Sequence, residues 1–107
     1  MAKQTNVTAS SKDVTPEMVG EWKNKYGDVF VVEAEGKKCW LRRPDRKVIG
    51  AATVLSNGDP MEQKEVIIRN CWLGGDMEFQ NEDRYFFALS GKVDEMVDIA
   101  TASLKKA

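Results

Sequence analysis

The stretch VFVVEAEGKKCWL, residues 29–41, determines the fold class, because it differs in composition from the chain on either side. Its two ends are rich in β-branched and aromatic residues and flank a Glu-Gly-Lys turn, which is the pattern of a β-hairpin. A hairpin alone is only marginally stable in water, so this one must pack on helices or gain a strand from a partner. Alternation places Phe30, Val32 and Ala34 on one face of the first strand, and Cys39 and Leu41 on one face of the second.

A short amphipathic helix is predicted before the hairpin. Thr15 supplies an N-cap, Pro16 suits the first helical position, and Glu17 places an acid in the first turn. Gly27 stands where a left-handed C-terminal cap would end the helix. Residues 1 to about 14 are polar and lack periodicity, so we expect a flexible tail there and a single domain over residues 15–107. The apolar residues at helical spacing are Met18, Val19, Trp22 and Tyr26.

Two further helices are predicted after the hairpin. Pro44 can open the first, and Asn57-Gly58 closes it. Asp59-Pro60-Met61-Glu62 opens the second with a variant of the capping box, in which an acid caps the helix and proline follows. Trp72-Leu73-Gly74-Gly75 ends it, and we interpret the glycines as a tight turn that folds the tryptophan back on the core. The apolar positions of the first of these helices are Val48, Ile49, Ala51, Ala52 and Leu55.

A last helix is expected to begin at Asn81 or Asp83 and to run to about Lys105. Gly91 interrupts it, so we expect a kink or a break there. The resulting order of helix, hairpin and three helices is that of an α+β domain dominated by helix. The apolar stripe of the last helix consists of Phe86, Leu89, Val93, Met96 and Ala100.

Composition argues against several classes of function. The 107 residues include no histidine, so the commonest general base and metal ligand is missing, and we expect no enzymatic activity, metal or cofactor. Cys39 and Cys71 stand alone in sequence and are expected to be buried free thiols. The 16 basic and 17 acidic residues give a net charge of −1, which argues against a chain that coats nucleic acid or anionic membrane. A polar N-terminus and the lack of a long apolar run predict a soluble, cytoplasmic protein that does not enter a membrane.

A basic cluster around the returning strand is the main candidate site. Strand alternation places Lys38, Trp40 and Arg42 on one face of that strand. Three interpretations remain open: a solvated strand edge, a protein interface with an exposed tryptophan, and a nucleic-acid surface where cations meet phosphates and the indole stacks on a base. The cluster, opposed only by Asp45, consists of Lys37, Lys38, Arg42, Arg43, Arg46 and Lys47.

Trp40 is predicted to be the partner-facing tryptophan, because burying it would draw its charged neighbours toward the core. We expect Trp22 and Trp72 to be mostly buried instead. Replacing Trp40 with alanine should then leave folding stability nearly unchanged and weaken partner binding. The residues predicted to bind a partner are Lys38, Trp40, Arg42, Arg43 and Arg46.

The C-terminal third is mainly acidic. A molecule with one basic and one acidic end can self-associate head to tail or bind a partner of mixed charge, and the ordinary alternative is an acidic solvent face on a helix. Gly74-Gly75-Asp76 lacks the spacing and the lysine of a P-loop, so a structural turn is favoured there over a phosphate site. The acidic residues are Asp76, Glu78, Glu82, Asp83, Asp94, Glu95 and Asp98.

A series of short motifs resembles a known family in its order and spacing. The motifs are Trp40-Leu41-Arg42-Arg43-Pro44 with Ala51-Ala52, then Asp59-Pro60 and Glu65, then Asn70-Cys71-Trp72-Leu73-Gly74-Gly75-Asp76. Together they resemble the small tail assembly chaperones of long-tailed bacteriophages, most of all the versions carried by phages and prophages of gut bacteria. The resemblance extends over about residues 20 to 105, and it does not cover the polar N-terminal tail.

The resemblance implies a non-enzymatic role with no catalytic residue. Chaperones of this family bind the long tape measure protein in the host cytoplasm, keep it soluble and help recruit tail tube subunits. The expected partners are therefore the tape measure protein and the tail tube protein. Two alternatives from other classes are a small nucleic-acid-binding regulator that uses the basic hairpin, and a minor structural protein of the tail or its connector.

Overall fold

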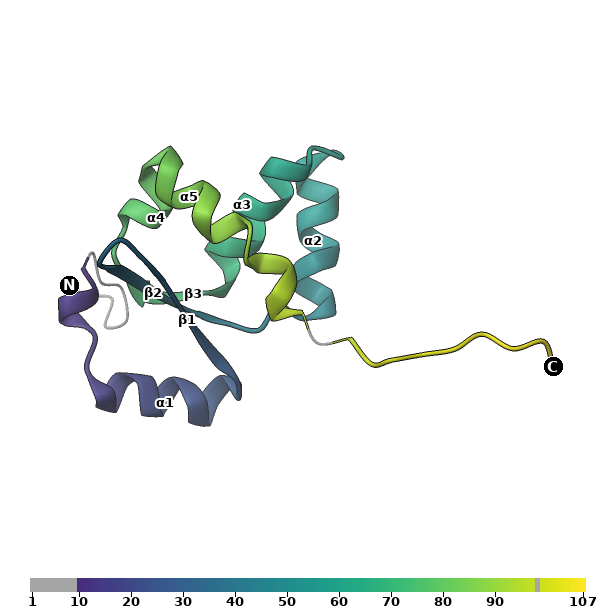
Figure 1. Cartoon of the computed structure of the whole chain (residues 1–107), viewed down its shortest axis with the longest axis horizontal. Helices are drawn as coiled ribbons and strands as arrows, with labels where there is room; N and C mark the ends of the chain where they lie inside the picture. Colours follow the sequence, from purple (N-terminus) through teal and green to yellow (C-terminus); the bar gives the residue numbers. More distant parts are fainter. Residues whose placement is uncertain (1–9, 98) are drawn as a thin grey trace.

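A three-stranded antiparallel sheet is packed among helices in the computed structural model, which describes residues 10–97 and 99–107 (Figure 1). The strands lie in the order β1 (Val29–Ala34), β2 (Lys37–Arg42) and β3 (Trp72–Gly75). Helix is the dominant element, so the predicted α+β class is confirmed. The helices are α1 (Pro16–Tyr26), α2 (Arg46–Ser56), α3 (Pro60–Cys71), α4 (Glu78–Asn81) and α5 (Asp83–Ser90), with 3-10 turns η1 (Ser11–Asp13) and η2 (Val93–Met96).

The predicted hairpin is present, and its faces are as expected. Strands β1 and β2 pair in register from Val29 opposite Arg42 to Ala34 opposite Lys37. The turn consists of Glu35 and Gly36, both with positive φ (49° and 84°), as a tight hairpin turn requires. The inward residues of β2, Cys39 and Leu41, are fully buried, while Phe30, Val32 and Ala34 of β1 are partly buried and pack against the same core.

The strand β3 was not predicted, because its glycines have the composition of a turn. Gly74 and Gly75 instead continue α3 into a strand that pairs with Trp40 and Cys39 of β2. The third strand that the hairpin needs therefore comes from the same chain, about thirty residues further on. Gly75 has φ 131°, and a Cβ on it would lie 2.5 Å from the Cys39 Cα and from the Lys38 carbonyl oxygen. Glycine is needed here for close backbone approach.

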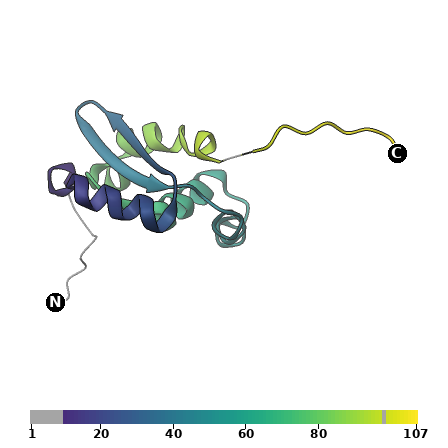
Figure 2. The same ribbon diagram turned by 90° about the horizontal axis from the view of Figure 1, so that it is seen from below.

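Helices cover the two faces of the sheet unequally. In Figure 1, α1 lies on one side of the strands, and α3, α4 and α5 lie on the other. Figure 2 shows the hairpin between α1 and the C-terminal helices from a second direction. The main core lies on the α3–α5 side, where Leu41, Ile68, Phe79 and Leu89 are fully or almost fully buried. Among the described residues, no helix combines the length and apolar character needed to cross a membrane.

Helices α2 and α3 begin where local capping chemistry predicts. The Asp45 carboxylate accepts from the Val48 N–H at 2.9 Å, so α2 begins at Arg46, two residues after Pro44. The Asp59 carboxylate accepts from Met61 N–H at 3.0 Å and from the next N–H at 3.3 Å, and Pro60 follows as the first helical residue. The buried residues of α2 are Val48, Ala52 and Ser56, whereas Leu55, an apolar position of the predicted helix, is 67% exposed.

The last predicted helix is shorter than expected. The predicted range contains the helix α5 and the turn η2, and the short helix α4 comes before it. The expected break at Gly91 is confirmed as the end of α5. Leu89, Val93 and Met96 are buried as predicted, but Ala100 is exposed and residues 99–107 are extended (Figure 1). A short helix depends on tertiary packing for stability, and residues 99–107 are exposed along their whole length.

The N-terminal boundary also differs from the prediction. Residues 10–14 form η1 and its caps, and the Ser11 backbone N–H donates to the carboxylate of Asp76 at 2.6 Å. They therefore belong to the folded domain rather than to a tail. The part of the predicted tail over residues 1–9 lies outside the described residues.

Replacing Gly75 with alanine should destabilise the protein strongly. The new Cβ would overlap backbone atoms of β2 at a φ that side chains rarely adopt, so we expect a loss of roughly 2–4 kcal/mol in the free energy of unfolding. Gly50→Ala in α2 is the matched control, because its Cβ meets nothing within 4 Å; it should gain about 0.5–1 kcal/mol from helix propensity. Urea unfolding measures the stability of both variants. Equal changes in the free energy of unfolding would contradict the close approach of Gly75 to the backbone of β2.

Candidate functional site

Three of the five predicted site residues line one hollow. Arg42, Arg43 and Arg46 meet there, at the end of β2 and the start of α2, whereas Lys38 and Trp40 are not part of its lining. The hollow has a volume of about 790 Å³, and we refer to it as the basic hollow. Its lining consists of Lys25, Tyr26, Arg42, Arg43, Pro44, Asp45, Arg46, Ile49, Gly50 and Val97.

Two of these arginines are held by contacts within the protein. Arg43 donates from Nη1 to the Met96 carbonyl oxygen at 2.7 Å and from Nη2 to the Asp28 carboxylate at 2.7 Å. Arg42 donates from Nη2 to the Asn70 carbonyl oxygen at 3.2 Å, and its Nη1 lies 3.9 Å from the Asp45 carboxylate. The two guanidinium groups therefore fasten the end of β2 to α3 and to η2.

The other two cations of the basic hollow are exposed. The Lys25 ammonium lies over the ring of Tyr26, 5.4 Å from its centroid, and the Arg42 guanidinium lies 5.7 Å from the same centroid. Arg46 makes no ion pair with any residue that the structure describes. The hollow thus combines a cationic rim with apolar surface from Tyr26, Ile49 and Pro44.

Trp40 is less exposed than predicted. The alternation of faces is confirmed, but the Trp40 ring is half-buried against Trp22 of α1, with centroids 6.5 Å apart and planes tilted by 48°. Trp22 is 4% exposed, as expected. Trp72 is also mostly buried and packs against the core, as expected, and its buried Nε1 has no hydrogen-bond acceptor among the described residues. Strand alternation identifies a face but cannot show which helix will cover it.

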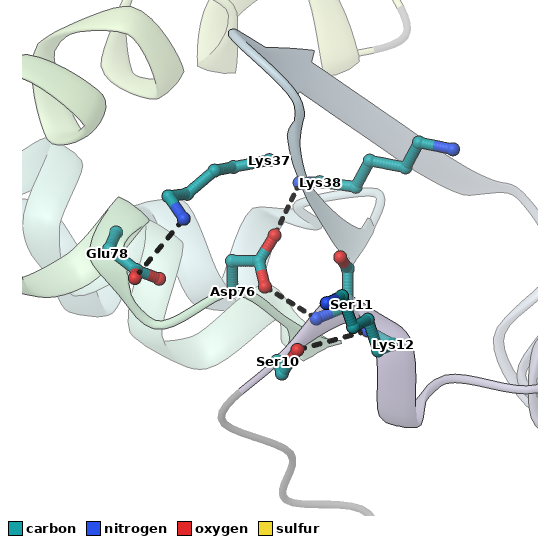
Figure 3. Close-up of polar contacts among 7 residues, drawn as sticks. All are labelled: Ser10, Ser11, Lys12, Lys37, Lys38, Asp76 and Glu78. Carbon is teal, nitrogen blue, oxygen red and sulfur yellow. Dashed lines mark hydrogen bonds and ion pairs between the residues drawn. The ribbon is translucent and has the colours of Figure 1, made fainter.

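The basic cluster of the sequence is divided between the two ends of β2. Lys37 and Lys38 lie at the end opposite Arg42, beside Asp76 (Figure 3). The Lys37 ammonium is 3.4 Å from the Glu78 carboxylate. The Lys38 backbone N–H donates to Asp76 at 2.9 Å, and the Asp76 N–H donates to the Lys38 carbonyl oxygen at 2.8 Å. One continuous cationic surface therefore does not form.

Asp76 is a buried carboxylate that is 7% exposed and held by backbone donors. Burial opposes its ionisation, but hydrogen bonds from Ser11 and Lys38 outweigh that effect, so the pKa of Asp76 lies below its ordinary value. Sequence reasoning placed this residue in an acidic surface. The signal that identifies it is its position directly after two glycines that pair with β2.

The two cysteines are free and buried, as predicted. Burial raises the pKa of the Cys39 thiol to about 12 and that of the Cys71 thiol to about 11. Both thiols therefore stay protonated and unreactive at neutral pH. Among the described residues, no group of three or more Cys, Asp or Glu side chains is placed to hold a metal ion.

A second hollow, not predicted from the sequence, lies between α3 and α5. We call it the α3–α5 groove; its volume is about 300 Å³. Phe87 is 55% exposed and Met61 is 46% exposed, and the Phe86 and Phe87 rings meet edge to face. In the sequence, the Phe86-Phe87 pair indicates an exposed aromatic residue, because only one of two adjacent helical residues can face the core. The lining is Met61, Glu65, Gln80, Asp83, Phe86 and Phe87.

The acidic residues of the C-terminal third do not share one helix face. Asp76 is buried, Glu78 pairs with Lys37, and Asp94 lies 3.3 Å from the Lys64 ammonium. Asp98 lies outside the described residues. The remaining carboxylates are dispersed over α5 and the turns beside it.

Replacing Asp76 with asparagine should lower stability and change its pH dependence. Asparagine has one acceptor oxygen for two backbone donors, so we expect a loss of roughly 2–3 kcal/mol near pH 7. The lowered pKa means that the stabilisation is complete above the unfolded-state pKa and is lost as pH falls through the folded-state pKa. The variant should therefore lose less stability than wild type between about pH 5 and pH 2.

Asp94→Asn is the control for this measurement, because it removes the charge of an exposed carboxylate. It should cost less than about 1 kcal/mol and leave the acid profile close to that of wild type. Identical acid profiles for the Asp76 and Asp94 variants would contradict a special role for Asp76.

Replacing Trp40 with alanine should now destabilise the protein, contrary to the expectation from sequence. The change removes the contact with Trp22, which is the buried residue of α1, and we expect a loss of about 2 kcal/mol. Val31→Ala is the control, since Val31 is paired with Trp40 and is exposed; it should cost less than about 1 kcal/mol. Urea unfolding measures the stability of both variants. An unchanged free energy of unfolding for Trp40→Ala would contradict the packing of Trp40 on Trp22.

Comparison of the chain with protein-family models, with curated proteins and with solved structures finds no match.

Proposed function

We propose that this protein is a non-enzymatic tail assembly chaperone of a long-tailed bacteriophage. It binds the tape measure protein in the host cytoplasm and helps recruit tail tube subunits. The observation that carries the proposal is the order and spacing of the motifs between Trp40 and Asp76, which resembles such chaperones.

The position of these motifs in the fold supports the resemblance. The Trp40–Pro44 motif leads from β2 toward α2, and Asp59-Pro60 begins α3. The Asn70–Asp76 motif includes the end of α3, all of β3 and the buried carboxylate. Most of the motifs that carry the resemblance therefore lie where one element of this fold meets the next.

The α3–α5 groove supports a binding role for the same protein. Exposed aromatic and methionine side chains suit the apolar face of an amphipathic helix, and methionine adapts to different side chains. Asp83 and Glu65 on the rim favour a helix flanked by lysine or arginine, although Glu65 also pairs with Arg69. We assign this groove to a helical segment of the tape measure protein.

The nucleic-acid alternative loses support from the divided cluster. Arg42 and Arg43 already donate to carbonyl and carboxylate oxygens of the protein, and Lys37 pairs with Glu78. Nucleic-acid affinity depends on several cations that meet successive phosphates, and of the four cations in the basic hollow only Lys25 and Arg46 are not already bound to oxygens of the described residues.

Coexpression with the tape measure protein of the same phage genome tests the function. Wild type should keep that protein soluble and copurify with it, whereas Phe87→Ser should reduce copurification about tenfold or more, because it removes an exposed aromatic anchor of the groove. Leu55→Ser is the matched control, since Leu55 is a large apolar residue that is 67% exposed, against 55% for Phe87, and lies outside the groove; it should bind like wild type.

Two results would contradict the proposal. A tape measure protein that is equally soluble and unbound with wild type present would exclude a chaperone. Stoichiometric amounts of the chain in purified phage particles would favour the structural alternative instead.

A further inference from the structure

We propose that the basic hollow is a binding site for an acidic peptide segment of a partner protein. Carboxylates of the segment meet Lys25 and Arg46, and one apolar side chain packs on Tyr26. This inference goes beyond the proposed function and does not depend on it, because the α3–α5 groove is assigned to a different segment.

The first support is the charge of the hollow. Four of its lining residues are cationic, and Asp45 is the one carboxylate among them. Arg42 and Arg43 are fixed by carbonyl oxygens of Asn70 and Met96, so their positions are set before a partner arrives. Fixed charges lower the ordering cost of binding.

The second support is the position of Arg46 at the start of α2. A cation there opposes the helix dipole, and the acid at this end, the N-cap Asp45, accepts from the Val48 N–H and lies near Arg42 without forming an ion pair with Arg46. Arg46 also makes no ion pair with the described residues. It therefore does not serve the stability of α2, and a bound anion would satisfy it.

The apolar surface of the hollow favours a peptide over nucleic acid. Tyr26 is 40% exposed, and Ile49 and Pro44 continue the same lining. An acidic peptide with one apolar residue can contact both the cations and the apolar surface of the hollow. A phosphate chain would use only the cations and would leave this apolar surface without a partner.

A second copy of this chain does not fit the hollow. The α3–α5 groove of a second copy is itself concave, so neither hollow can fill the other. The extended residues 99–107 contain two lysines and no Asp or Glu, so they offer the hollow no acidic side chain. We therefore assign the hollow to a segment of another protein.

A labelled peptide tests the site in the full-length protein. The probe is a short fluorescein-labelled peptide in which glutamates flank a central leucine-phenylalanine pair, and its anisotropy reports binding. Arg46→Glu and Lys25→Glu should each weaken binding about tenfold, because each reverses a charge that faces the segment. Lys47→Glu is the matched control: it makes the same change on the next residue of α2, which does not line the hollow.

The stability of these variants gives a second readout. Arg46→Glu and Lys47→Glu both place an acid in the first turn of α2, so both should unfold at slightly higher urea concentration than wild type. Weaker peptide binding by Arg46→Glu but not by Lys47→Glu, with both variants at least as stable as wild type, supports the site. If Arg46 only maintained the fold, its replacement would weaken peptide binding only by lowering stability.

Other outcomes overturn the inference. Equal weakening by all three variants would indicate nonspecific charge attraction, and no binding of the probe to wild type would exclude the site. Tighter binding of an oligothymidine strand than of the peptide, sensitive to Arg46→Glu, would assign the hollow to nucleic acid. Probe-dependent dimers would assign it to a second copy. Solubilisation of the tape measure protein is measured separately, so either proposal can fail alone.

Discussion

The buried carboxylate of Asp76 joins three parts of the chain that are distant in sequence. It accepts from the N–H of Ser11 and of Lys38, while its own N–H donates to the Lys38 carbonyl oxygen. These bonds connect the N-terminal turn, β2 and the end of β3. The close approach of Gly75 to Cys39 belongs to the same junction, since a side chain on Gly75 would separate the two strands that Asp76 holds.

The position of α1 follows from this junction and from one aromatic contact. The turn η1 directly precedes α1 and is held by Asp76, and Trp22 then packs on Trp40 of β2. Between these two points, α1 covers the outer face of the sheet. Its C-terminal residues Lys25 and Tyr26 are thereby placed beside the start of α2, where they complete the basic hollow.

Local signals in the sequence were sufficient for the elements that depend on local chemistry. The caps of α2 and α3 and the faces of the hairpin are set by residues within a few positions of one another. The strand β3 is not set by nearby residues, because its glycines form a strand only by pairing with β2. The last helix was predicted too long for a similar reason. The helical spacing of apolar residues continues past Gly91, but α5 ends there and residues 99–107 are exposed.

The candidate site could be predicted only in part. The grouping of Arg42, Arg43 and Arg46 follows from their nearness in sequence, whereas Lys25 and Tyr26 join them through the packing of α1. The separation of Lys38 from this group follows from the length of β2, which places it at the opposite end of the strand. The α3–α5 groove required knowledge of where α5 ends and which phenylalanine faces outward.

The contact between Trp22 and Trp40 also has an optical consequence. Two indoles 6.5 Å apart and tilted by 48° couple their electronic transitions, and such coupled chromophores give a paired positive and negative band in circular dichroism. Trp22 is the buried residue of α1, so this band reports the docking of that helix separately from the unfolding of the main core. The protein thus contains its own spectroscopic probe for the attachment of α1, with no label required.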